Sequence, residues 1–169
     1  MTCTLILGGA RSGKSRRALA LAEQSHDQRI FIATAEALDE EMAARIEQHK
    51  AERGRGWITL EEPIDLCAAI ERSAALDKVC VVDCLTLWIS NLMHHQRNLN
   101  DETDRLCAML AKSSGAIVMV SNEVGMGLVP ESALGRRFRD AQGRLNQAVA
   151  NVCDRVEFVA AGLPITLKG

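Results

Sequence analysis

The chain has 169 residues, of which 47% are hydrophobic and 25% charged, so it can form one domain with a sizeable buried core. Its 20 lysines and arginines nearly balance 22 aspartates and glutamates, and the net charge of −2 excludes a broad basic surface for nucleic acid or anionic membranes. The first residues lack the pattern of a signal peptide, and no apolar run approaches the ~20 residues of a membrane span. We therefore expect a single cytoplasmic domain, residues 1–169, that binds small molecules or proteins and neither nucleic acid nor membranes.

Short aliphatic runs alternate with longer amphipathic segments along the chain, which is typical of an α/β fold with a mostly parallel sheet flanked by helices. We predict strands at 4–7, 30–33, 79–83, 116–121, 156–160 and 165–167, the last two forming a short C-terminal hairpin. We predict helices at about 14–25, 39–53, 64–76, 86–96, 101–113 and 132–150. The segments without regular periodicity are 54–63, 98–101 and 122–132.

The six cysteines, at positions 3, 67, 80, 84, 107 and 153, form no CxxC pair and no metal-finger spacing. Several of them lie inside aliphatic runs such as VCVVDC. We therefore expect reduced thiols in the core of a cytosolic protein.

The first predicted strand leads into GGARSGKS, which matches the phosphate-loop pattern GxxxxGK[ST] and precedes a predicted helix. Backbone N–H groups of such a loop surround phosphate oxygens, Lys14 can reach the outer phosphates, and the Ser15 hydroxyl can ligate Mg²⁺. The motif predicts a P-loop NTPase fold of the RecA-like kind, without choosing a reaction. The predicted nucleotide contacts are Gly8, Gly9, Ala10, Arg11, Ser12, Gly13, Lys14 and Ser15.

Asp83 ends the aliphatic run VCVVD, at the position where a second acidic group for Mg²⁺ is expected. The alternative is that Asp83 caps a helix opening at Thr86. The pocket for the nucleotide is then expected where the strands 4–7 and 79–83 end.

Four stretches together resemble one family. They are GGARSGKSRRA at 8–18, IATAEALDEEMAARIEQHKAER at 32–53, VVDCLTLWISNLM at 81–93 and SNEVGMGLVPESALGRRFRDAQGRLNQ at 121–147. They resemble the bifunctional adenosylcobinamide kinase / adenosylcobinamide-phosphate guanylyltransferase family of cobalamin biosynthesis. The resemblance implies that adenosylcobinamide is phosphorylated with ATP or GTP. GMP is then transferred from GTP onto that phosphate through a GMP-histidine intermediate, with release of pyrophosphate.

The resemblance assigns the nucleophile to His49, at the end of an R-I-x-x-H pattern in residues 45–49. An imidazole with a pKa near ~6.5 is largely neutral at neutral pH and can attack the α-phosphorus of GTP. From the residues alone, His49 closes an apolar stripe of a helix, and a half-buried structural histidine is the alternative. Arg45, Lys50 and Arg53 can neutralise the triphosphate or form a solvated basic helix face.

The resemblance also implies GTP contacts outside the phosphate loop, at Ala33, Thr34, Ala35, Lys50, Ala51, Glu52, Arg53, Glu61 and Asp83. An acidic side chain suits the donor edge of guanine, and from local sequence Glu62 is as good a candidate as Glu61. The implied cofactors are GTP, ATP and Mg²⁺, and the implied assembly is a homo-oligomer, with a trimer suggested.

Two other segments are candidates for the acceptor side. The glycine-containing loop 122–130 follows a strand, and we expect it to border the corrinoid or the phosphoryl acceptor, unless it is a structural turn. Arg136, Arg137 and Arg139 either meet phosphates or form an exposed helix face. Two other functions remain open from the residues: a plain small-molecule kinase in which His49 is structural, and a nucleotide-driven binding or assembly module.

Overall fold

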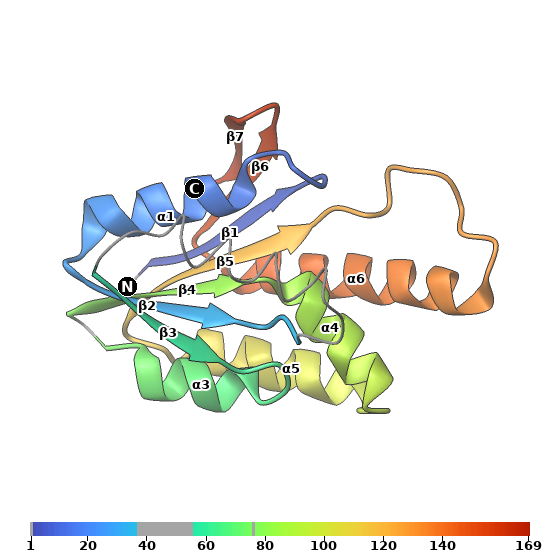
Figure 1. Ribbon diagram of the computed structural model, residues 1–169, viewed down its shortest axis with the longest axis horizontal. Helices are drawn as coiled ribbons and strands as arrows, with labels where there is room; N and C mark the ends of the chain where they lie inside the picture. Colours follow the sequence, from blue (N-terminus) through green and yellow to red (C-terminus); the bar gives the residue numbers. More distant parts are fainter. Residues whose placement is uncertain (1, 37–55, 76) are drawn as a thin grey trace.

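The computed structural model describes residues 2–36, 56–75 and 77–169 of the chain (Figure 1). Its strands are β1 (Thr2–Gly8), β2 (Gln28–Ala33), β3 (Trp57–Glu61), β4 (Lys78–Asp83), β5 (Ala116–Asn122), β6 (Arg155–Ala160) and β7 (Leu163–Lys168). Helices in the described parts are α1 (Lys14–Ser25), α3 (Leu66–Ser73), α4 (Leu85–His94), α5 (Leu99–Leu110) and α6 (Ala133–Val152).

The strands form one sheet in the order β3-β2-β4-β5-β1-β6-β7, in which β7 alone runs antiparallel to its neighbour. This confirms the predicted mostly parallel sheet and its C-terminal hairpin. Strand β5 lies between β1 and β4, so one strand separates the end of β1, where the phosphate loop begins, from Asp83. In this register Gly8 pairs with Asn122, and Asp83 pairs with Ala33 on one side and Val120 on the other. These strand ends therefore meet at one edge of the sheet.

The core lies on both faces of the sheet because alternate residues of each buried strand point to opposite sides. One cluster joins strand residues such as Leu5 and Val82 to helices α3, α4, α5 and α6. The other joins residues such as Ile6 and Val81 to Ala18 and Ala22 of α1. Figure 1 shows α1 on one side of the sheet and these other helices on the opposite side. The near-continuous aliphatic strands are thus buried on both faces.

Segment 54–63 was predicted to be irregular, and this prediction is wrong for residues Trp57–Glu61, which form strand β3. Strand β3 is at the edge of the sheet and pairs with β2 alone, so its residues are only partly buried and carry no aliphatic run. Its β-branched and aromatic residues favour a strand, and Trp57 contacts Phe31 of β2 edge-to-face, with ring centroids 6.2 Å apart.

Segment 98–101 was also predicted to be irregular, but α5 begins at Leu99. The Asn98 side chain accepts hydrogen bonds from the N–H groups of Asn100 and Asp101, at 3.1 and 3.5 Å. This cap starts the helix earlier than its apolar periodicity indicates. Among the described helices none is both long and apolar enough to cross a membrane.

Candidate active site

The phosphate loop connects the end of β1 to the start of α1, as predicted. Gly8 and Gly13 have positive φ angles of 151° and 100°, which favour glycine. A Cβ on Gly8 would lie 2.4 Å from the Val159 carbonyl oxygen, and one on Gly13 would lie 3.2 Å from the Gly162 Cα. Both glycines are therefore required by backbone angle and by close approach of the β6–β7 hairpin.

Two backbone hydrogen bonds hold the phosphate loop from outside. The Gly162 N–H, in the turn between β6 and β7, donates to the Ser12 carbonyl at 2.8 Å. The Glu123 N–H, just after β5, donates to the Gly8 carbonyl at 3.0 Å. The loop conformation thus depends on segments that are far away in sequence, and motif analysis had no signal for either contact.

Lys14 is buried, with 6% of its surface exposed, at the first residue of α1. Its Nζ donates a hydrogen bond to the Gly9 carbonyl. Burial lowers the pKa of Lys14, and the nearby Cys84 and Asp83 partly offset this effect. The side chain is therefore folded back over the loop, where an ammonium group can neutralise phosphate oxygens.

Asp83 ends β4 at the same edge of the sheet, close enough for its charge to act on Lys14. It was alternatively predicted to cap the next helix, but the residue at the N-cap of α4 is Cys84. Ser15 lies in the first turn of α1 and is half-buried. A hydroxyl and a carboxylate are the oxygen ligands that Mg²⁺ prefers, and they fit an ion that also binds nucleotide phosphates. No cluster of three or more histidine, cysteine, aspartate or glutamate side chains suited to a metal ion occurs in the described residues.

The ends of β2 and β3 carry the next group of predicted contacts. Thr34, just after β2, is fully buried and its hydroxyl bonds the backbone of Cys84, while Ala35 is half-buried. Glu61 ends β3 and is exposed, and Glu62 accepts hydrogen bonds from the N–H groups of Ile64 and Asp65 at 3.1 and 2.8 Å. Glu62 thus shapes the turn into α3.

The proposed nucleophile His49 lies outside the described residues. The same is true of the predicted GTP contacts Lys50, Ala51, Glu52 and Arg53, and of the helix predicted at 39–53. The side chain of Glu36, the last described residue before them, has its Oε1 3.4 Å from the Nε2 of His95.

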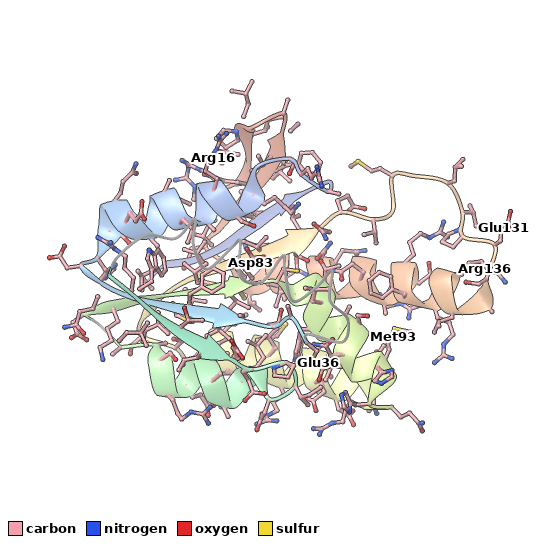
Figure 2. The ribbon with its side chains drawn as sticks, viewed as in Figure 1. Arg16, Glu36, Asp83, Met93, Glu131 and Arg136 are labelled. Carbon is pink, nitrogen blue, oxygen red and sulfur yellow. The ribbon has the colours of Figure 1, made fainter. Side chains whose placement is uncertain are left out.

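The loop 123–132 extends away from the sheet and leads into α6 (Figure 2). Arg136 donates to the carbonyl oxygens of Pro130 and Glu131 at 3.0 and 2.6 Å, so it holds the loop against the helix. Figure 2 shows Arg136 and Glu131 where this loop meets the start of α6, away from Asp83. Arg137 is exposed, and Arg139 lies 3.6 Å from Asp140. Arg136 and Arg137 are therefore exposed on α6, whereas Arg139 is half-buried.

A buried polar network that sequence reasoning missed lies beneath the end of β5. The Ser121 hydroxyl and the Gln142 amide bond the Asn146 side chain at 2.6 and 2.9 Å, and the Asn146 amide donates to the Asn122 carbonyl at 3.1 Å. Gln142 and Asn146 are four residues apart on α6 and so share one face. The network fixes the strand end that borders both the phosphate loop and Asp83.

These features define a nucleotide-binding enzyme of the P-loop class, and solved structures of that class share the fold. The flagellar accessory protein FlaH from Methanocaldococcus jannaschii superposes with a TM-score of 0.55 at 14% identity, covering 99% of this chain and 78% of that one. An ATPase of a type III secretion system of pathogenic bacteria superposes with a TM-score of 0.58 at 9% identity, covering 98% of this chain and 56% of that one. At these identities the likeness shows the fold alone.

Sequence comparison identifies the family. The model of the family described as cobinamide kinase / cobinamide phosphate guanyltransferase matches residues 4–167. The bifunctional adenosylcobalamin biosynthesis protein CobP of Pseudomonas aeruginosa is 48% identical over 167 residues, which cover 98% of this chain and 96% of that one. CobU of Salmonella typhimurium, which carries the same description, is 39% identical, with 97% and 98% covered. The chain belongs to this family and is a bifunctional enzyme of cobalamin biosynthesis, which confirms the resemblance noted in its sequence.

Proposed function

We propose that this enzyme uses the carboxyl edge of its sheet for two successive transfers. In the first, the hydroxyl of adenosylcobinamide attacks the γ-phosphorus of ATP or GTP, the bond from that phosphorus to the β–γ bridging oxygen breaks to release ADP or GDP, and the hydroxyl proton passes to solvent. In the second, GMP passes from GTP to adenosylcobinamide phosphate, which gives adenosylcobinamide-GDP and pyrophosphate. The observation that carries the proposal is the buried Lys14, folded over the phosphate loop beside Asp83, in a chain of this family.

In this scheme tasks fall to Gly13, Lys14 and Ser15 of the loop and to Asp83 of β4. The backbone N–H groups of Gly13 and its neighbours bind phosphate oxygens at the start of α1, where the helix dipole favours negative charge. Lys14 neutralises the charge that develops on the transferred group. Ser15 and Asp83 would hold Mg²⁺, which supplies further neutralisation of the triphosphate.

The guanylyl transfer is proposed to use His49 as a covalent carrier. A ring nitrogen of the neutral imidazole attacks the α-phosphorus of GTP, and the bond to the β-phosphate oxygen breaks to release pyrophosphate. A phosphate oxygen of adenosylcobinamide phosphate then attacks the same phosphorus, and the P–N bond breaks. The support for His49 is the R-I-x-x-H pattern at 45–49 in a member of this family.

Labelling with GTP tests this step directly. Incubation with α-labelled GTP and Mg²⁺ is expected to leave label on the protein that is labile in acid and stable in base. His49→Ala is expected to abolish the label and retain phosphorylation of adenosylcobinamide. His94→Ala, a change at another of the four histidines, serves as the matched control and is expected to label normally. Label that persists in His49→Ala would contradict the assignment, and an enzyme that never labels would be a plain kinase.

The remaining parts of the proposal concern base recognition and assembly. Glu61 at the end of β3 is proposed to accept hydrogen bonds from guanine. The loop 122–130 is proposed to border the acceptor, because it follows β5 directly beside Gly8 and exposes Met126 and Leu128 at 79% and 95%. We also propose a homo-oligomer, a trimer by the family resemblance, and a cytoplasmic location, in accord with cysteines that are all free in the described chain.

A further inference from the structure

Thr34, the residue that follows β2, makes three hydrogen bonds to the backbone of Asp83 and Cys84. Its hydroxyl donates to the Cys84 carbonyl at 2.7 Å and accepts from the Cys84 N–H at 2.8 Å. Its own N–H donates to the Asp83 carbonyl at 3.3 Å. Thr34 has 0% exposure, so this hydroxyl is committed to the protein interior.

Further hydrogen bonds fix both sides of this arrangement. The Asn91 amide, on α4, donates to the Thr34 carbonyl at 2.7 Å and to the Pro63 carbonyl at 3.1 Å. On the other side, the Asn122 N–H donates to the Thr86 hydroxyl at 2.7 Å. The segment that leads from Asp83 into α4 is therefore attached to the ends of β2 and β5, its two neighbours in the sheet.

The geometry points to Thr34 as a positioning residue, which sets the place of the Asp83 carboxylate through the Asp83–Cys84 backbone. The inference rests on the proposed function, in which Asp83 would hold Mg²⁺. It assigns the Thr34 side chain a different task from the GTP contact that the family resemblance implies, because a hydroxyl bonded twice to Cys84 points into the protein.

A positioning role has a clear physical basis at this site. Mg²⁺ demands near-octahedral ligands at about 2.0–2.1 Å, so a small displacement of a ligating carboxylate weakens binding. Asp83 is the last residue of β4, where strand pairing no longer holds the following peptide. The Thr34 hydroxyl replaces the missing strand contacts just beyond that point. A merely structural hydroxyl would contribute to stability and leave metal affinity unchanged.

The test compares Thr34→Val, which keeps the shape and removes the hydroxyl, with Thr34→Ser, which keeps the hydroxyl. The main measurement is the dissociation constant of Mn²⁺, followed by electron paramagnetic resonance in the presence of a non-hydrolysable GTP analogue. We expect Thr34→Val, which loses both hydrogen bonds to Cys84, to weaken Mn²⁺ binding by about tenfold, and Thr34→Ser to remain within about twofold. The KM for adenosylcobinamide is expected to stay unchanged in both.

Ser73→Ala is the matched control, because the buried Ser73 hydroxyl also donates to a backbone carbonyl, that of Ala69 at 2.6 Å, but lies on α3. It is expected to lower stability and leave Mn²⁺ affinity unchanged. Equal Mn²⁺ affinity in Thr34→Val and the wild type, or equal loss in Thr34→Val and Thr34→Ser, would overturn the inference. If Thr34→Val does not fold, Asn91→Ser is measured instead, because it removes the hydrogen bond from the Asn91 amide to the Thr34 carbonyl. An unchanged Mn²⁺ affinity in that variant would equally overturn the inference.

Combination with Asp83→Asn separates this inference from the proposed function. If Thr34 acts through Asp83, adding Thr34→Val to Asp83→Asn is expected to change Mn²⁺ affinity no further. Independent, additive losses would refute the positioning role while leaving Asp83 as a metal ligand. If Asp83→Asn by itself leaves Mn²⁺ affinity unchanged, the proposed role of Asp83 fails, and the inference fails with it.

Discussion

Glu157 is a fully buried carboxylate in the middle of β6. It accepts two hydrogen bonds from Arg17 of α1, both at 2.8 Å. Arg155 approaches from the same strand, with its Nε and Nη2 at 2.9 and 2.7 Å. The hydrogen bond from Arg17 is the main cause that holds the pKa of Glu157 below its ordinary value. Glu157 therefore attaches the helix that follows the phosphate loop to the sheet.

Glu157→Gln removes the charge and leaves two guanidinium groups beside a neutral amide. Breaking a buried ion pair by removing one partner costs ~3–5 kcal/mol. The Arg17 and Arg155 side chains keep 26% and 42% exposure, so water relieves part of this cost. We expect a loss of about 3 kcal/mol in the free energy of unfolding. For a chain of this length that corresponds to a fall in Tm of roughly 6–12 °C.

Urea and thermal unfolding of both proteins, near neutral pH and in acid, measure this loss. Because the folded-state pKa of Glu157 is lowered, its contribution is complete above the unfolded pKa and is lost as the pH falls through the folded pKa. The difference between wild type and Glu157→Gln should thus be largest near neutral pH and shrink below about 4.5. Asp140→Asn, which removes an exposed carboxylate 3.6 Å from Arg139, is the control. It should cost less than about 0.5 kcal/mol. A loss under ~1 kcal/mol for Glu157→Gln, or one that acid does not reduce, would refute the role given to this ion pair.

Lys14→Ala should lower kcat of both transfers by about 10²–10³-fold, measured by product formation, and a loss below tenfold would contradict its placement over the phosphates. Gly8→Ala should weaken nucleotide binding in calorimetry, because the added Cβ would lie 2.4 Å from the Val159 carbonyl oxygen, and unchanged affinity would speak against that approach. Gly143→Ala should raise the free energy of unfolding by ~0.5–1 kcal/mol at unchanged activity, since a Cβ there meets open space in α6. Burial raises the pKa of the Cys84 thiol to about 12, so it should react with a disulfide reagent at mildly alkaline pH only after unfolding, and rapid native labelling would refute this.

The parts of the fold and site that depend on local pattern could be predicted. The phosphate loop with Lys14, and Asp83 at the end of β4, lie at one edge of the sheet, as predicted. Their positions could be predicted because a loop motif and the end of an aliphatic strand are both local features of the sequence. Aliphatic runs located the buried strands, since strands covered on both faces need apolar residues throughout. Strand β3 was not predicted because it is an edge strand with only partly buried residues and so has no aliphatic run. The start of α5 was not predicted because the Asn98 cap, and not apolar periodicity, determines it.

The contacts that complete the site could not be predicted in the same way. The Thr34 hydroxyl reaches Cys84, 50 residues away, and the pairing depends on which strands become neighbours in the sheet. The network of Ser121, Gln142 and Asn146 likewise depends on how α6 lies beneath β5. Neither has a spacing that a linear motif can express. Family resemblance locates residues near the nucleotide, but it does not separate side chains that contact it from those that position others.

The hydrogen bond between Gly162 and Ser12 has a consequence for synthesis of the chain. The phosphate loop leaves the ribosome before its supports at Glu123, Val159 and Gly162, which follow more than a hundred residues later. Strand β1 itself pairs with β5 and β6, which are also late. A nascent chain lacking the β6–β7 hairpin therefore exposes a glycine-rich loop without the Gly162 hydrogen bond to Ser12 and without the packing of Val159 against Gly8. Nucleotide binding should thus arise only once that hairpin has emerged, so that phosphate affinity reports completed synthesis of the sheet.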